Sequence, residues 1–132
     1  MVQLSIREHS RREIDRHKWL ASQRAGCDLG EVAVKEWITL HWSGYWRARC
    51  MEHLQGKAYW TELKGDDFGI LEDRFQHRAL LADRIADRLK AGQENLDIIQ
   101  WALNWHIDMD AVLDILATLD INNKRMGYPF GS

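Results

Sequence analysis

Seven of the 132 residues are tryptophan, and they are spread along the chain from Trp19 to Trp105. A tryptophan side chain covers a large apolar area and carries one N–H that needs a partner, so it lies either at a seam of the core or in a partner-binding surface. The chain must therefore cover seven large rings, inside the fold or against another molecule. No catalytic or cofactor motif accompanies them, so they predict a packed body before any particular chemistry.

The composition is that of one ordinary domain. Hydrophobic residues make up 45% of the chain, enough to bury a single core, and we expect one helical domain over residues 1–132 with flexible ends near 1–9 and 122–132. The formal net charge of −2 gives no overall attraction to nucleic acid or to an anionic membrane. Any such contact would need a local patch of charge.

The cysteines indicate a reducing compartment. Cys27 and Cys50 have no CxxC spacing, and no secretory signal precedes them, so we interpret them as reduced thiols in a cytoplasmic protein. No apolar run approaches the ~20 residues that a membrane-spanning helix needs. The sequence therefore predicts no contact with a membrane.

The chain has a single proline, Pro129, so nothing upstream interrupts helices in the way that proline does. Ser10 with Glu13 forms a capping-box pattern, and Asp28 with Glu31 repeats it after Gly26. Asp108 is a plausible N-cap for the last helix. These signals predict an all-α fold, a compact bundle of about five helices with a tryptophan-rich core. The predicted helices are residues 10–25, 29–55, 70–91, 94–105 and 109–119.

The predicted helix over 29–55 has apolar residues around most of its circumference, with Trp37 on one side and Trp42 and Trp46 nearly opposite. Either this helix is central and surrounded, or it breaks at Ser43-Gly44; we favour the central helix. The helix over 94–105 is expected to pack deeply. Four rings in strongly apolar helical contexts are predicted to lie in the core: Trp42, Trp46, Trp101 and Trp105.

Residue patterns for catalysis or metal binding are weak. Glu13/His17 and Asp73/His77 have the i,i+4 spacing of two ligands on one helix face, but paired Glu-x-x-His motifs and HExxH are absent. There is neither a P-loop nor GxGxxG. Cys50 lies three residues before His53, a spacing more typical of core filling than of a nucleophile. We expect no metal, no cofactor and no catalytic residues.

Residues 17–30 carry the pattern HKWxxSxxAGxDxG, which resembles a short stretch in a group of uncharacterised bacterial proteins, some of which carry it beside a kinase-like region. The resemblance implies bacterial origin and no particular activity, and this chain has no kinase-like motif. The stretch can be a helix-stop-helix corner with Trp19 covering the junction. Alternatively, four residues form a polar cluster at a helix N-terminus that could hold an anionic group. These residues are His17, Lys18, Ser22 and Asp28.

The last two predicted helices have the layout of a small helix-turn-helix. Their end, residues 111–121, is similar to the short helical modules at the front of bacterial translation initiation factors. A recognition helix presents basic or amide side chains to DNA, whereas this one offers four aspartates: Asp108, Asp110, Asp114 and Asp120. We therefore interpret the pair as a stabilising or protein-contacting lobe.

Two further stretches are candidate contact surfaces. The first predicted helix is basic, and Arg11, Arg12 and Arg16 could face an acidic protein surface or an RNA backbone, or simply form a solvated helix face. The predicted loop between residues 56 and 69 carries three aromatics that need either the core or a partner to cover them. They are Tyr59, Trp60 and Phe68, with Trp60 as the preferred exposed anchor.

Together these features favour a non-enzymatic protein-interaction or accessory subunit of a cytoplasmic bacterial assembly. The alternative is an RNA- or ribosome-associated factor that uses the basic N-terminal helix. A third hypothesis is a small-molecule enzyme at the His17/Asp28 corner. A protein partner is expected, RNA is the rival partner, and self-association stays open.

Overall fold

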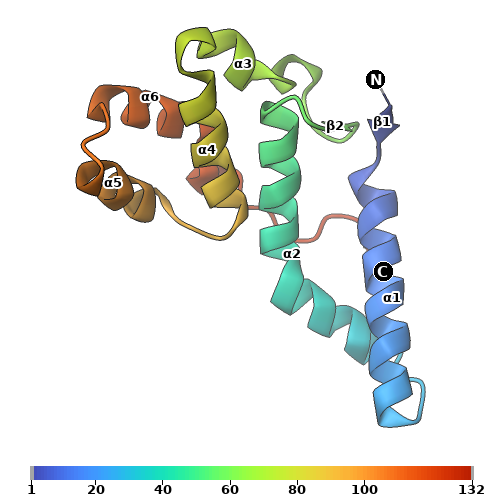
Figure 1. Ribbon diagram of the computed structural model, residues 1–132. Helices are drawn as coiled ribbons and strands as arrows, with labels where there is room; N and C mark the ends of the chain where they lie inside the picture. Colours follow the sequence, from blue (N-terminus) through green and yellow to red (C-terminus); the bar gives the residue numbers. More distant parts are fainter. Residues whose placement is uncertain (1, 132) are drawn as a thin grey trace.

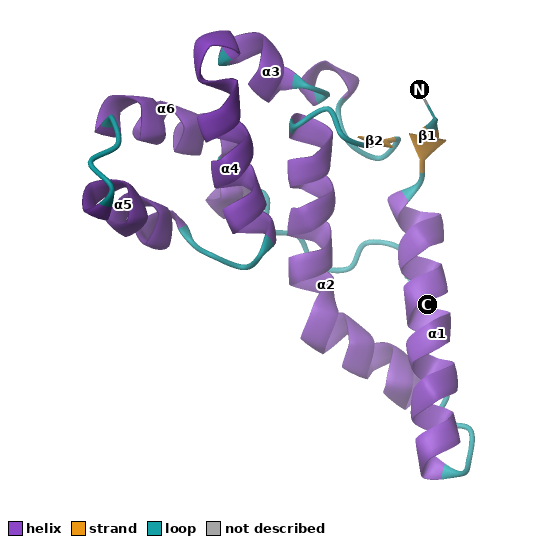
Figure 2. Cartoon of the chain, in the orientation of Figure 1, coloured by secondary structure: helices purple, strands orange, loops and turns teal. Residues whose placement is uncertain are grey.

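The fold is all-α, as the sequence predicts, and was obtained as a computed structural model that describes residues 2–131. Six α-helices and two short paired strands make up the described chain (Figures 1 and 2). Their order is β1 (Gln3–Leu4), α1 (Ile6–Ala25), α2 (Glu31–Leu54), β2 (Tyr59–Trp60), α3 (Ile70–Arg74), α4 (Ala79–Lys90), α5 (Asn95–Asn104) and α6 (Met109–Leu119). Strands β1 and β2 pair in parallel, which ties the N-terminus to the loop after α2.

Helix α1 begins at Ile6, four residues before the predicted start at Ser10. Ser5 is the N-cap, and its hydroxyl accepts a hydrogen bond from the Glu8 N–H (3.2 Å). The carboxylate of Glu62 accepts the N–H groups of Ile6 (2.7 Å) and Arg7 (3.0 Å), so a distant residue completes the cap. Ser10 instead lies buried within the helix. The N-terminal segment 1–9 was predicted to be flexible, but residues 3–9 form strand β1 and the start of α1.

Helix α2 is continuous from Glu31 to Leu54, so it is not broken at Ser43-Gly44. Figure 1 shows that it bends along its length, and a glycine within a helix is one known cause of bending. Its first half runs beside α1, and its second half contacts α4 and β2. The apolar residues around its circumference therefore serve different neighbours at the two ends.

The prediction of one continuous helix over 70–91 is wrong. The segment forms two helices, α3 and α4, which are separated by a 3-10 turn at Gln76–Arg78. Phe75, at the break, has φ −119° and ψ 47° and is buried. Leu71, Phe75 and Leu89 all face the core on either side of the break. The apolar period continues through the turn, so the pattern contains no signal of it.

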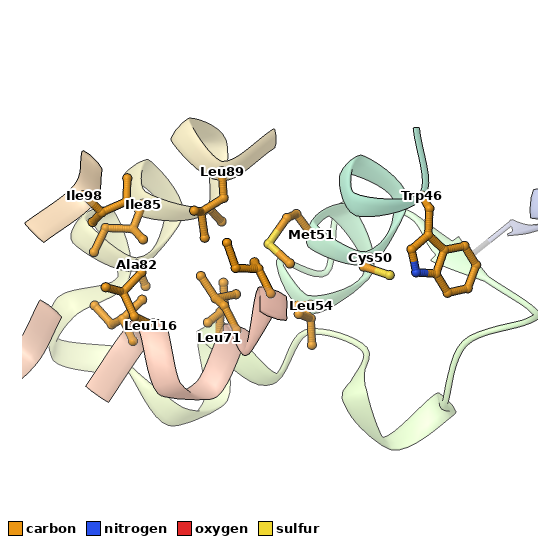
Figure 3. Close-up of a cluster of buried hydrophobic side chains, with 14 of the residues drawn as sticks. Trp46, Cys50, Met51, Leu54, Leu71, Ala82, Ile85, Leu89, Ile98 and Leu116 are labelled. Carbon is orange, nitrogen blue, oxygen red and sulfur yellow. The ribbon is translucent and has the colours of Figure 1, made fainter. Parts of the chain in front are cut away.

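The core joins the second half of α2 to α4, α5 and α6. Figure 3 shows Met51 of α2 beside Leu89 of α4, and Ile85, Ile98 and Leu116 further along the same cluster. Met51, Ile85 and Leu89 have no exposed surface. This packing fixes the helical body against which the rest of the chain is placed.

His53 organises the loop that follows α2. Its Nδ1 accepts the N–H of Trp60 (3.2 Å), so its Nε2 carries the hydrogen that bonds the carbonyl oxygen of Lys64 (2.7 Å). The carbonyl of His53 accepts the N–H groups of Gly56 (3.1 Å) and Gly69 (2.9 Å). One buried histidine thereby holds the loop at four points.

The C-terminal tail, predicted to be flexible over 122–132, packs on α2 through residues 126–130. The indole N–H of Trp42 donates to the carbonyl of Met126 (2.8 Å). The rings of Tyr128 and Phe130 meet Trp42 edge-on, at centroid distances of 5.0 and 6.1 Å. Apolar residues in the tail thus complete the cover of a core tryptophan.

The tryptophans fall into two groups, and two of the sequence-based assignments are wrong. Trp42 and Trp46 are buried as predicted, and Trp101 is partly buried. Trp105 was predicted in the core but is 72% exposed, since α5 turns Ile98 and Ala102 inward and ends before it. Trp60 was predicted to be exposed but is buried, because β1, α1 and α2 surround it.

No helix within residues 2–131 combines the length and the apolar character that crossing a membrane requires.

Changing Trp60 to alanine should destabilise the fold by about 3–5 kcal/mol, because it empties a buried aromatic site next to His53. Chemical denaturation followed by circular dichroism measures this loss. Trp60→Phe is the control: within residues 2–131 the indole N–H of Trp60 has no acceptor, so Phe keeps most of the packing and loses no hydrogen bond. A Trp60→Ala protein with the stability of the parent would place the ring outside the core.

Glu62 should give the fold a pH-dependent contribution. Burial alone would raise the pKa of this carboxyl, but the hydrogen bonds from Arg7, Ile6 and Ser5 lower it below its ordinary value. The contribution is therefore present above the unfolded-state pKa of ~4.3 and is lost as the pH falls through the folded-state pKa. Glu62→Gln should lower the melting temperature at pH 7 and converge on the parent in acid. A difference that does not change with pH, or an equal effect of Glu13→Gln at the exposed surface, would contradict this.

Candidate interaction site on the helical arm

The second half of α1, the corner after it and the first half of α2 form a helical arm, defined here as residues 15–40. In Figure 1 the arm extends away from α3–α6, and its end is the corner between the two helices, drawn as a loop in Figure 2. No residue from Asp15 to Val32 is buried. The packing of the arm begins only at Ile14 on α1 and at Ala33 and Trp37 on α2.

The corner is built by four residues of the HKWxxSxxAGxDxG pattern. Gly26 ends α1 in the left-handed conformation (φ 72°). The hydroxyl of Ser22 accepts the N–H of Leu29 (3.1 Å), and Asp28 Oδ1 accepts the N–H of Gly30 (2.9 Å). Gly30 has φ 52° and ψ −128°, a conformation that needs glycine, and it caps α2 in place of the predicted Asp28. Ser22 and Asp28 thus have structural roles in the turn.

His17 joins the two helices of the arm. Its Nε2 lies 2.9 Å from Oε1 of Glu36 on α2, and its ring is next to that of His41, with centroids 6.1 Å apart. His17 therefore faces the seam between α1 and α2. It does not line the hollow that contains the other residues of the predicted polar cluster.

Trp19 is the exposed aromatic residue of the pattern. Its side chain is 62% exposed and lines a shallow hollow with Gly26, Cys27 and Asp28, so it borders the junction without being packed over it. Within residues 2–131 it takes part in no side-chain hydrogen bond and in no ring contact. Three aliphatic side chains at this end of the molecule are also exposed: Leu20, Val32 and Leu40.

Two open hollows follow the sides of the arm. One, of about 630 Å³, is lined by Lys18, Trp19, Ser22 and Asp28 among others. The predicted cluster is therefore brought together except for His17, which lines the second hollow, of about 510 Å³, between α1 and α2. Both hollows are shallow surfaces at a helix pair rather than enclosed cavities, which suits a protein contact better than a buried small molecule.

The predicted basic residues lie on the exposed surface of α1. Arg11 pairs with Asp15 (3.7 Å), one turn further along the helix. Arg12 and Arg16 are exposed and make no ion pair within residues 2–131. At four and three residues apart, Arg12, Arg16 and Trp19 share one face of the helix. The outer face of α1 therefore combines positive charge with an exposed aromatic ring.

The loop aromatics do not form the expected anchor. Trp60 is buried, and Tyr59 and Phe68 pack on the ring of His53 at centroid distances of 5.1 and 5.4 Å. The three aromatics thus belong to the core and its margin. The prediction of an exposed anchor in this loop is wrong.

Side chains with potential chemistry are held in unreactive settings. Burial raises the pKa of the Cys50 thiol to about 11, which keeps it protonated near neutral pH. Both ring nitrogens of His53 are occupied by backbone groups. Within residues 2–131 no three His, Cys, Asp or Glu side chains are placed to hold a metal ion together.

Comparisons of the chain with protein-family models, with curated proteins and with solved structures give no match. The assignment of a function therefore rests on the geometry of the chain itself.

Helix phase was the signal that could have identified Trp19. It lies seven residues after Arg12 and three after Arg16, and an aromatic residue in phase with two arginines falls on the solvent side of an amphipathic helix. Leu40 and Val32 gave no comparable signal, because the apolar residues of α2 surround the helix.

Proposed function

We propose that the protein is a non-enzymatic interaction subunit of a cytoplasmic bacterial assembly and that it binds a partner protein through the end of the helical arm. The observation that carries this proposal is the position of Trp19. The residues that build the corner, and His17, which joins the two helices, have structural roles, whereas the Trp19 side chain is largely exposed. An exposed tryptophan is typical of the few residues that dominate binding energy at an interface.

The charge around Trp19 supports one kind of partner surface. From Arg7 to Arg24, α1 carries five arginines and one lysine against three acids. A partner that fits this surface has an apolar pocket for the indole ring and acidic side chains at its rim. The exposed side chains of Leu20 and Leu40 extend the apolar contact along the arm.

The structure offers a matched pair of tryptophans for a test. Trp19 and Trp105 are both exposed, and in Figure 1 α1, which carries Trp19, and α5, which Trp105 follows, lie on opposite sides of the molecule. A photo-crosslinking residue at the exposed position of Gln23, one helical turn after Trp19, leaves Trp19 in place and identifies the companion in the source cells. Calorimetry with the purified companion then measures affinity. Trp19→Ala should weaken binding by about tenfold or more, ~1.4 kcal/mol, with an unchanged melting temperature. Trp105→Ala should change neither quantity.

Two outcomes would contradict the proposal. Equal losses of affinity in the two variants, or a loss in Trp105→Ala alone, would place the contact outside the arm. A homodimer that Trp19→Ala dissociates would show that the arm binds a second copy of the chain rather than a different protein.

A second candidate function, RNA binding, is favoured by the free arginines on α1. Arg12 and Arg16 are exposed, unpaired within residues 2–131 and next to an aromatic ring, a combination typical of single-strand contacts. Under this hypothesis, affinity for a single-stranded RNA oligonucleotide falls linearly with salt on logarithmic axes, by about 0.7 per phosphate contact. Replacing Arg11, Arg12 and Arg16 by Gln should flatten that slope while the helical circular dichroism signal stays. Binding that does not change with salt would exclude the RNA hypothesis.

A further inference from the structure

A separate cavity lies on the side of α2 away from the body, between its second half, the 59–69 loop and the start of the C-terminal tail. It has a volume of about 290 Å³, near the lower end of the ~300–1,000 Å³ typical of small-molecule sites. The arm does not line it. What fills it is therefore a different question from what binds the arm.

The floor of the cavity is apolar. Trp46, Cys50 and Leu54 follow one another at four-residue steps along one face of α2, and all three are buried (Figure 3). Leu63 from the loop and Met126 from the tail complete the apolar lining. Such a floor accepts a hydrocarbon group, and the indole N–H of Trp46, which has no acceptor within residues 2–131, is its one strong hydrogen-bond donor.

The rim of the cavity is positively charged. Lys64 comes from the loop and Lys124 from the tail, and neither makes an ion pair within residues 2–131. Arg125 also lines the cavity and reaches Glu94 at 3.5 Å. Two lysines that approach from separate segments without an acidic partner leave positive charge at the mouth.

Two acids also line the cavity, Glu62 and Asp67. Both oxygens of Glu62 accept from the start of α1, from Ser5, Ile6 and Arg7, so its negative charge faces the partial positive charge of that helix N-terminus. At the mouth, Lys64 and Lys124 therefore outnumber Asp67, the one carboxylate that is not turned to a helix N-terminus.

Both walls of the cavity are fixed before any ligand arrives. The carbonyl of Lys64 is bonded to His53, and the N–H of Lys124 donates to the carbonyl of Ile121 (3.1 Å). The tail is tied to α2 through the bond from Trp42 to Met126. A site that is already formed binds without the cost of ordering its walls.

We propose that this cavity binds a small carboxylate with an apolar body, whose carboxylate lies between Lys64 and Lys124 and whose hydrocarbon part lies on Trp46, Cys50 and Leu54. The arrangement pairs charge with charge and apolar surface with apolar surface, and it excludes large or strongly polar ligands. It is independent of the arm and of any partner bound there.

The test uses hexanoate as the probe, 1-hexanol as its neutral counterpart and inorganic phosphate as an anion without an apolar body. Titration of the full chain is followed by two-dimensional ¹H–¹⁵N NMR. Hexanoate should give saturable shifts at the indole N–H of Trp46 and at the amides of residues 62–67 and 121–126. The affinity for hexanol and the affinity for phosphate should each be lower than that for hexanoate by about tenfold or more.

The variants separate binding from folding. Combining Lys64→Gln with Lys124→Gln should lower the affinity for hexanoate by about tenfold or more. The melting temperature should equal that of the parent, since neither side chain makes an ion pair within residues 2–131. Lys35→Gln, an exposed lysine on the arm, is the matched control and should bind like the parent. Shifts that stay linear with hexanoate, equal binding of hexanol or phosphate, or equal affinity in the double variant would each overturn the proposal.

Discussion

The buried imidazole of His53 is the interaction on which the arrangement of this chain depends. It lies at the end of α2, and its ring and carbonyl bond four backbone groups of the loop that follows. With the loop held there, β2 can pair with β1 and Glu62 can reach the first turn of α1. The start of α1, and hence the direction in which the arm leaves the body, therefore depends on a histidine far away in sequence.

Helix α2 connects two parts of the molecule that are built differently. Its second half belongs to a closely packed body, where Met51 has no exposed surface, whereas its first half contributes to the arm through little more than Ala33 and Trp37. Because α2 is one continuous helix, its packing in the body also sets the direction of the arm. The proposed contact at Trp19 is on α1, whereas the proposed ligand site at Trp46 is on the second half of α2, so the two sites are chemically separate.

The sequence predicted the helical class, the region of each main helix, the Asp108 cap and the burial of Trp42 and Trp46, because local spacing determines these features. It could not predict that Ser5 would cap α1 in place of Ser10, since the deciding carboxylate is 56 residues away. Trp60 was misassigned for the same reason, because β1 and α1, distant in sequence, lie against it, whereas Trp105 was misassigned because α5 ends one residue before it. At the arm, Lys18, Ser22 and Asp28 were correctly placed together, whereas His17 turned to the helix seam and the role of Trp19 was missed.

The lack of buried side chains between Asp15 and Val32 has a consequence for how the arm behaves in solution. Opening of its last turns exposes almost no apolar surface, so the free energy of local opening there is only a small part of the global value. Backbone amides at the end of α1 should therefore exchange their hydrogens long before those near Met51. A partner that clamps the arm in its helical form must also supply the free energy of ordering it, so tight binding and a frayed free state are linked through the same few turns.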